Sequence, residues 1–561
     1  MRTIHQTLFA LSLVITSMAN ASHALDTSTQ AVKAEPNGPL YVASTAESTK
    51  GDLILNNTLL VDTIERALNE FNTPGMAVSV VYQGESLLIN GFGKANINKN
   101  IDATADTYFR LASVSKAFTS AALAILVDQG KLSWDDKVIQ HLPNFTMHDP
   151  YVTREFTVTD LLTHRSGLVS GAGDSMIWPE PSGFSRDEVI HNLRYLKPEY
   201  SFRARYAYSN VLYITAGELV AKLSGQSFDD FVNEHIFTAL EMPCFAGDMP
   251  STAVKNSAMA YGHSDERGIY PVTRNNISET GLMSAAAGGM VCNAKGMSKW
   301  LHALLSQENL PFSKQQLNKM LSPETILGIS SIEKEWDNTQ FKSYGLGWRL
   351  SNLGHLKMVS HTGTLSGYQA YIALLPELEF GVAILNNGSN SAARGAVMQT
   401  LIKGLLEYKE IDIRHAQAQI EQSSSDWVDN YIEYLNEREQ RYLTNYVSPK
   451  AISDMSIANE TIVGEYRDKW FGSMHIVKEN GILRISSSRM TTLKGTVLPF
   501  QDFSFKVEWD NKNAASDAFI HFTVNVNREV TSARMHPFTV AERVNHAYKD
   551  MEFIKVVSEE E

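Results

Sequence analysis

One apolar stretch constrains the fold of this chain more than any other segment. Residues 115–127 are apolar nearly throughout, are rich in good helix formers and are followed by Gly130, a pattern that predicts a helix buried on every face. Ser113 and Lys116 stand at its N-terminus, three residues apart, so their side chains fall on one helix face within reach of each other. The helix dipole at this end favours developing negative charge. A serine nucleophile with an amine base is built in this way.

The Ser-x-x-Lys pattern is short enough to arise by chance. Ser331 and Lys334 repeat it in a polar stretch with no apolar helix behind it. The match at Ser113 therefore depends on the rest of the chain for its interpretation.

Strand patterns occur on both sides of the apolar helix, whereas the middle of the chain is mostly helical. An amphipathic helix over 57–71 precedes them, and residues 138–240 form helices and loops, among them a capped helix at 157–162 and an apolar one at 211–223. The strand-like segments are 76–82, 86–92, 344–348, 358–361, 368–375 and 381–385. This order predicts an α+β domain over 51–408, an antiparallel β-sheet flanked by helices, whose first and last parts meet around an inserted helical subdomain.

The C-terminal part has a different pattern. Residues 409–458 are charged and helical, which indicates a linker. Short alternating strands then follow within 459–557, at 472–477, 482–486, 503–509, 518–524 and 530–535. Evenly spaced short strands predict a small antiparallel β-barrel.

The N-terminal residues have the pattern of an export signal. Residues 1–24 combine Arg2, an apolar run over 8–15 and small residues before position 25. Residues 25–50 are polar and without periodicity, which indicates a disordered leader. No later segment approaches 18 apolar residues, so we expect no membrane anchor. The mature protein is therefore expected to be exported and soluble, either periplasmic or secreted.

Charge and cysteine content narrow the classes of partner. The formal net charge is -13, with acidic residues dispersed along the chain, and no basic patch that would bind nucleic acid is visible. Cys244 and Cys292 are the two cysteines, and in an exported protein they are expected either to pair or to stay free and buried. The sequence leaves the oligomeric state open.

Three patterns follow one another along the predicted domain: Ser113-Val-Ser-Lys116, Tyr208-Ser-Asn210 and His361-Thr-Gly363. In this order they resemble the motifs of the serine penicillin-recognising enzymes, in the branch of class C β-lactamases, D-Ala-D-Ala carboxypeptidases, D-aminopeptidases and related esterases. The resemblance extends over residues 55–405. Its surroundings also match the branch, at 161–168, 287–290, 344–348 and 367–368.

The resemblance implies a role for each motif residue. Ser113 would attack the carbonyl carbon, while Lys116 and Tyr208 would move its proton to the leaving group. Asn210, His361, Thr362 and Gly363 would bind and orient the substrate, and the backbone N–H groups of Ser113 and Thr364 would form the oxyanion hole. No metal or cofactor is implied. Burial would make Lys116 a neutral amine, and neighbouring cations would make Tyr208 a phenolate, so either remains a candidate base.

The resulting functional hypothesis is a serine hydrolase that acts through an acyl-enzyme on Ser113. It would hydrolyse amide bonds in a small molecule or short peptide, either a D-amino-acid-containing peptide or a β-lactam. Two alternatives stay open, a small-ester esterase and a penicillin-binding sensor or scaffold without turnover. His361 replaces the lysine usual in class C β-lactamases, which argues against efficient β-lactam hydrolysis, and the C-terminal segment resembles a lipocalin-like domain.

Two arginines before the second motif depart from the family pattern. Arg203 and Arg205 precede Tyr208, where the family often has Pro-Gly. They indicate either an anionic group on the substrate or simply charges in solvent.

Overall fold

The computed structural model describes residues 57–247, 249–272, 283–413, 427–445, 455–511, 517–537 and 548–557. The predicted signal and leader, 1–24 and 25–50, lie outside these residues. No helix within the described ranges has the length and apolar character needed to cross a membrane.

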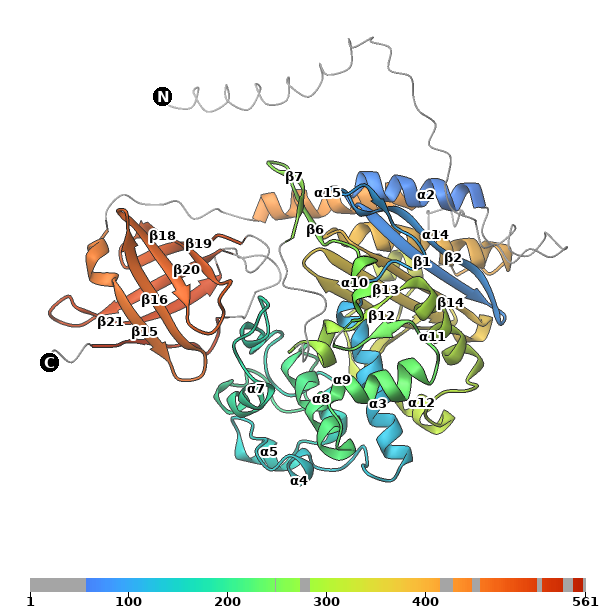
Figure 1. Cartoon of the computed structure of the whole chain (residues 1–561), viewed down its shortest axis with the longest axis horizontal. Coiled ribbons are helices and arrows are strands. Elements are labelled where there is room, and N and C mark those ends of the chain that lie inside the picture. Colours follow the sequence, from blue (N-terminus) through green and yellow to red (C-terminus); the bar gives the residue numbers. More distant parts are fainter. Residues whose placement is uncertain are drawn as a thin grey trace, which may run out of the picture. The chain divides into compact units, whose positions relative to one another are not determined.

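The described residues include a nine-stranded antiparallel sheet in which strands from the first and last parts of residues 57–413 meet (Figure 1). Its strands, in sheet order, are β3 (Ile101–Asp102), β2 (Glu85–Asn96), β1 (Gly75–Tyr82), β14 (Phe380–Asn386), β13 (Tyr368–Leu375), β12 (Leu356–Leu365), β11 (Arg349–Leu353), β10 (Lys342–Tyr344) and β9 (Thr325–Ile326). Met76 pairs with Asn386 and Tyr82 with Phe380. The predicted antiparallel sheet is confirmed, with strands from its first and last parts, β1 and β14, paired side by side.

Helices cover both faces of this sheet. Helices α2 (Asn57–Glu70) and α14 (Ser391–Tyr408) lie along one face, and α11 (Ala294–Ser306) lies along the other (Figure 1). In β1, Val78 and Val80 pack with the α2 and α14 side, whereas Ala77 and Val81 pack with the opposite core. All eight residues of β1 are buried for this reason.

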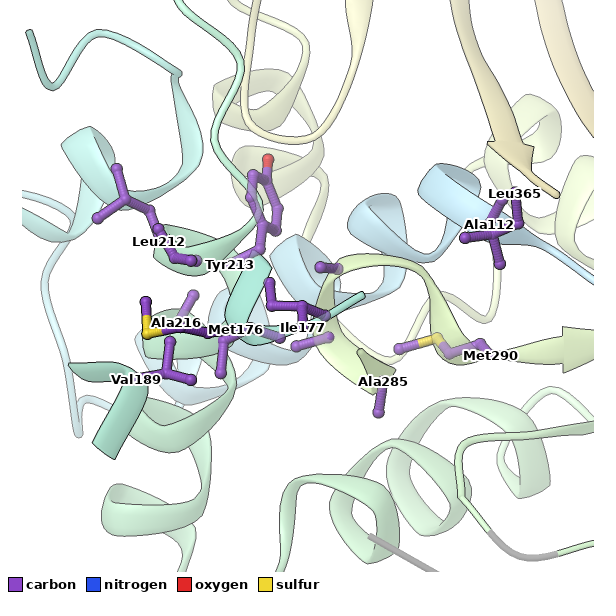
Figure 2. Packing of buried hydrophobic residues seen from close by; sticks show 14 of the residues in the cluster. Ala112, Met176, Ile177, Val189, Leu212, Tyr213, Ala216, Ala285, Met290 and Leu365 are labelled. Atoms are coloured by element: carbon purple, nitrogen blue, oxygen red, sulfur yellow. The ribbon is translucent and has the colours of Figure 1, made fainter. Parts of the chain in front are cut away.

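The helical region between the strands surrounds α3 (Ser115–Asp128), and residues 115–126 of α3 are all buried. The predicted all-round burial is therefore confirmed. The other helices are α4 (Val138–His141), α5 (Pro150–Glu155), α6 (Val158–Leu162), α7 (Arg186–Asn192), α8 (Val211–Ser224), α9 (Phe228–Val232), α10 (Ser251–Lys255), α12 (Lys314–Met320) and α13 (Ser331–Asp337). Figure 2 shows part of this core, including Met176, Leu212, Ala285 and Met290.

Two small sheets accompany the nine-stranded sheet, and one of them carries a disulfide. They are β4 (Phe109–Arg110), β8 (Val291–Cys292) and β5 (Cys244–Phe245), and separately β6 (Tyr261–Ser264) with β7 (Gly268–Pro271). Cys244 and Cys292 are direct partners in the first of these and are disulfide-bonded. Of the two states left open by the sequence, the paired one is found.

One predicted strand is wrong. Residues 344–348 were expected to form a strand, but only Tyr344 belongs to one, and residues 345–348 connect β10 to β11. Gly347 has a φ of 82°, which interrupts an extended chain. A Cβ at this position would lie 2.8 Å from the Lys116 carbonyl oxygen. The glycine therefore brings this turn against the first turn of α3.

The described part of residues 455–557 forms a closed eight-stranded antiparallel barrel, which confirms the expected barrel. Its strands are β15 (Gly464–Asp468), β16 (Gly472–Glu479), β17 (Ile482–Ser487), β18 (Lys494–Gln501), β19 (Ser504–Trp509), β20 (Ala518–Val524), β21 (Val530–Pro537) and β22 (Phe553–Lys555). Asn480 and Gly481 both have positive φ, as the two-residue hairpin turn requires. Within the predicted linker, α15 (Val428–Asn445) is helical.

Candidate active site

Ser113 lies in a short 3-10 turn, η1 (Ala112–Val114), directly before α3. The preceding residue, Ala112, has a φ of 48°, a strained conformation that is kept where the surrounding structure enforces it. Strand β12 provides this surrounding. A Cβ on Gly363 would lie 2.2 Å from the Leu111 carbonyl oxygen and 3.1 Å from the Ser113 nitrogen. The third motif therefore packs its backbone directly on the turn that carries the first.

Lys116 is fully buried and has three polar neighbours. Its Nζ lies 2.7 Å from Asn210 Oδ1, 2.6 Å from the Ala287 carbonyl oxygen and 3.4 Å from Ser113 Oγ. Burial lowers the pKa of Lys116 well below its usual range, with Asp174 acting to raise it and Arg349 to lower it. A neutral amine has two N–H donors and one lone pair, so the two close acceptors take both hydrogens. The lone pair is then left for the Ser113 hydroxyl.

Tyr208 stands on the other side of this amine. The centre of its ring is 4.7 Å from Lys116 Nζ. Its hydroxyl is buried and has no hydrogen-bond partner of good geometry among the described residues. Burial, and then Tyr206, raise the pKa of Tyr208 well above its usual value, while Arg349 and the Ser113 hydroxyl oppose this. The phenol therefore stays protonated at neutral pH.

Asn210 links the amine to a carboxyl group that the sequence analysis missed. Asn210 precedes α8, but its side chain makes no capping hydrogen bond. It accepts from Lys116 and donates through Nδ2 to Asp174 Oδ2 at 2.9 Å. Burial raises the pKa of Asp174 to about 6, while Asn210 and Lys116 hold it lower than burial alone would. No motif marks Asp174, which follows Gly171-Ala-Gly173 and begins the short 3-10 helix η2 (Asp174–Met176).

His361 is brought to the same region but faces other protein groups. It is fully buried, its Nδ1 lies 2.8 Å from the Thr362 carbonyl oxygen, and its Nε2 lies 2.9 Å from the Tyr344 hydroxyl. Because a carbonyl only accepts, Nδ1 carries the hydrogen and Nε2 accepts from Tyr344. Burial, Arg349 and Lys116 lower the pKa of His361 well below its usual value. His361 is therefore neutral, and both of its ring nitrogens are engaged by protein groups, Thr362 and Tyr344.

An aromatic cluster supports these groups from behind. The ring of His164 lies 4.2 Å from that of Tyr208 and 4.6 Å from that of Tyr344, centre to centre. His164 Nδ1 accepts a hydrogen bond from the Ser209 backbone N–H. The segment 161–168, which resembled the family, thus fixes the tyrosine of the second motif.

Arg349 is a second residue that the sequence analysis missed. Its Nη1 donates to Thr362 Oγ1 at 3.0 Å, and it also bonds the Tyr206 hydroxyl. No carboxylate of the described residues forms an ion pair with this guanidinium. Its positive charge acts to lower the pKa of Tyr208 and of Lys116. In the sequence, the one feature that could have pointed to Arg349 is its position directly after the segment 345–348.

The arginines before the second motif have structural partners. Arg203 Nη2 lies 2.6 Å from Asp160 Oδ2, and the Arg205 guanidinium lies 4.2 Å from the Tyr200 ring centre. Within the described ranges, no group of three His, Cys, Asp or Glu side chains is placed to hold a metal ion.

Four motif residues lie together with Asp174, next to the backbone of β12. They are Ser113, Lys116, Tyr208 and Asn210.

Two family models match the chain. The model described as "Beta-lactamase" matches residues 60–407, and one described as "Domain of unknown function (DUF3471)" matches 449–554. Two solved structures show the same fold. An octameric penicillin-binding protein homologue from Pyrococcus abyssi matches with a TM-score of 0.55 and 19% identity, over 89% of this chain and 100% of that one. D-amino acid amidase from Ochrobactrum anthropi SV3 matches with a TM-score of 0.51 and 22% identity, over 64% of this chain and 99% of that one.

Curated relatives are similar to part of this chain. Unguisins hydrolase ungD' of Aspergillus campestris (strain IBT 28561) is 28% identical over 359 residues, which cover 61% of this chain and 64% of the relative. Protein flp of Staphylococcus aureus (strain MW2) is 26% identical over 332 residues, covering 58% and 62%. Each match spans less than two thirds of the relative. Because the first family model spans well over half of the sequence, the chain belongs to the beta-lactamase family.

Proposed function

We propose that this protein is an exported serine hydrolase that forms an acyl-enzyme on Ser113 and hydrolyses amide bonds in D-amino-acid-containing peptides or β-lactams. The observation that carries the proposal is the environment of Lys116. Its Nζ lies close to two acceptors, Asn210 Oδ1 and the Ala287 carbonyl oxygen, and 3.4 Å from Ser113 Oγ, so a neutral amine that donates to both acceptors keeps its lone pair for the Ser113 hydroxyl. A buried amine with a lowered pKa is suited to accept a proton near neutral pH.

The proposed reaction begins with proton transfer from Ser113 Oγ to Lys116 Nζ as Oγ bonds the carbonyl carbon. The backbone N–H groups of Ser113 and Thr364 stabilise the oxyanion. Tyr208, protonated because its pKa is raised, gives its proton to the leaving nitrogen and regains one from Lys116. Lys116 then takes a proton from a water molecule as its oxygen bonds the acyl carbon, the bond to Ser113 Oγ breaks to release the acid, and Lys116 returns the proton to Oγ. Of the two candidate bases, the pKa directions favour Lys116.

The substrate class follows from Arg349 and from the relatives. Among the described residues, the partly buried Arg349 guanidinium bonds the hydroxyls of Thr362 and Tyr206 and forms no ion pair, which suits it to bind a carboxylate. We therefore propose that the preferred substrate has a carboxylate near the scissile bond, as a peptide C-terminus does. An amidase and a hydrolase among the relatives fit amide chemistry.

Labelling tests the nucleophile. A fluorophosphonate probe and a fluorescent penicillin should label the wild-type protein, and Ser113→Ala should abolish both labels. Equal labelling of the variant would refute the assignment. Turnover of a panel of D-amino acid amides, D-Ala-D-Ala peptides, a chromogenic cephalosporin and p-nitrophenyl esters then identifies the substrate class. Ester turnover far above amide turnover would favour the esterase, and a permanent adduct without product would favour the sensor.

A matched substrate pair tests Arg349. Arg349→Gln should raise KM for a peptide with a free C-terminal carboxylate while leaving KM for its C-terminal amide unchanged. The same loss with both substrates would exclude the proposed carboxylate contact.

The domain plan and the location are proposals too. We propose a signal at 1–24, a leader at 25–50, a catalytic domain at 51–408, a linker at 409–458 and a lipocalin-like barrel at 459–557. Export to the periplasm or medium is supported by the disulfide between Cys244 and Cys292. The N-terminal sequence of the mature protein tests cleavage, and residue 1 at the N-terminus of the exported protein would exclude it.

A further inference from the structure

A buried arginine on α14 reaches the strand that carries the third motif. Arg394 is 6% exposed. Its Nη1 donates to the carbonyl oxygens of Gly363 and Ala370, the latter at 2.8 Å, and its Nη2 donates to Thr364 Oγ1 at 3.1 Å. Gly363 and Ala370 are paired across β12 and β13. One guanidinium thus holds both strands at the point nearest to Ser113.

The electrostatics of this arginine are unusual for a residue that only stabilises the fold. No carboxylate in the described part of the chain forms an ion pair with Arg394, and its acceptors on these strands are neutral oxygens. Burial lowers its pKa to about 10, so it remains a cation at neutral pH. A buried cation without an ion-pair partner is costly. Its retention therefore calls for a reason besides packing.

The hydrogen bond from Arg394 to the Gly363 carbonyl oxygen suggests such a reason. The carbonyl of Gly363 and the N–H of Thr364 are the two ends of one peptide group. A charged donor on the carbonyl oxygen draws electron density toward that end, which makes the N–H at the other end more positive. This peptide lies beside the turn of Ser113, because a Cβ on Gly363 would be 3.1 Å from the Ser113 nitrogen.

We propose that Arg394 is a positioning residue that orients and polarises the Gly363–Thr364 peptide, so that the Thr364 N–H binds the oxyanion more strongly. The proposal rests on the proposed function, in which this N–H is an oxyanion donor. Arg394 itself touches neither substrate nor reacting atoms. It acts from the opposite side of the strand, through the amide group.

The carbonyl stretch of the acyl-enzyme reports on the oxyanion donors directly. Benzylpenicillin labelled with ¹³C at the β-lactam carbonyl, or a p-nitrophenyl ester labelled at its acyl carbonyl, supplies the acyl group, and difference infrared spectroscopy gives its frequency. In Arg394→Met the frequency should rise, and the acylation rate should fall about 10- to 100-fold, because a complete loss of one donor costs about 100- to 1,000-fold. Arg394→Gln, which keeps a neutral donor, should give a smaller change of the same sign.

Lys403 provides the matched control. It lies on the same helix, is equally buried, and bonds Asp337 and the Trp336 carbonyl rather than β12. Lys403→Met should therefore lower stability without changing the carbonyl frequency.

Each outcome decides the proposal. Wild-type frequency and rate in a folded Arg394→Met or Arg394→Gln protein would overturn it, as would an equal frequency change in Lys403→Met. If Arg394→Met does not fold, Arg394→Gln decides alone. If the wild-type protein forms no adduct on Ser113 with either acyl donor, the proposed function fails and this proposal fails with it.

Discussion

Gly363→Ala isolates the effect of distance between β12 and the nucleophile turn. Gly363 is not in the left-handed region, so alanine fits its backbone conformation and only the added methyl group matters. That Cβ would lie 2.2 Å from the Leu111 carbonyl oxygen and 2.9 Å from Ala112 Cβ. Ordinary van der Waals contact begins at 3.4 Å. The strand and the turn must therefore separate by about 1 Å, because backbone lies on both sides.

The magnitude follows from this separation. A displacement of about 1 Å in a catalytic constellation costs about 100-fold in rate, and the same displacement carries the Thr364 N–H away from Ser113. We expect the acylation rate with a fluorescent penicillin, measured by stopped flow, to fall about 100-fold. The free energy of unfolding should fall by about 1 to 3 kcal/mol, as for other overpacked sites.

A second glycine of the same sheet provides the control. A Cβ on Gly381, in β14, would lie 3.0 Å from Leu301 Cδ2 and 3.1 Å from Leu374 Cδ2, which are ends of flexible side chains. Gly381→Ala should lose stability of similar size and keep its acylation rate. A Gly363→Ala protein that acylates as fast as Gly381→Ala would refute the reasoning.

Three further predictions concern pH and stability. The Asp174 carboxylate raises the pKa of Lys116, and Lys116 must be neutral to act as the base. Asp174→Asn should therefore move the acid limb of the pH profile of kcat/KM to lower pH. An unmoved limb would contradict this coupling between Asp174 and Lys116. Replacing both Cys244 and Cys292 by serine should lower the free energy of unfolding by about 4 kcal/mol, the entropic value for a loop of 48 residues, as measured in urea against the oxidised wild type. Burial raises the pKa of Asp160, but Arg203, Thr157 and Arg165 outweigh it and hold that pKa below its usual value. Asp160→Asn should therefore cost about 3 kcal/mol at neutral pH. The difference in urea stability should shrink as pH falls below the ordinary aspartate value of 3.8 and through the lowered pKa of the folded state. A pH-independent difference would show that the charge of Asp160 is not responsible.

Much of the fold was predictable because burial leaves a periodic pattern in the sequence. The apolar run of α3 and the continuous apolar run of β1 correspond to elements buried on all sides. The strand prediction for 344–348 was wrong because the aromatic residues of this segment favour a strand, whereas Gly347 has a positive φ and packs against α3. The barrel strands β15, β18 and β22 were not predicted; β18 contains Gly495 and Pro499, which weaken a strand pattern, and β22 has three residues.

The grouping of the motif residues was predictable, whereas their proposed roles remain predictions. Ser113, Lys116, Tyr208 and Asn210 came from the order of short patterns, and the structure brings all four together. Asp174, Arg349 and Arg394 have no such pattern, because each depends on contacts with residues that are distant in the chain. A charged residue on α14 is expected to face solvent from local sequence alone, yet Arg394 bonds a strand 31 residues earlier.

The pairing of β1 with β14 has a consequence for biosynthesis. Met76 leaves the ribosome about 300 residues before its partner Asn386, which at about 5 to 20 residues per second is roughly 15 to 60 s. During that time the hairpin of β1 and β2 presents one open, apolar strand edge, which is a site for pairing with other chains. The sheet is complete only when β14 has paired with β1, so until then this edge is open to pairing with other chains.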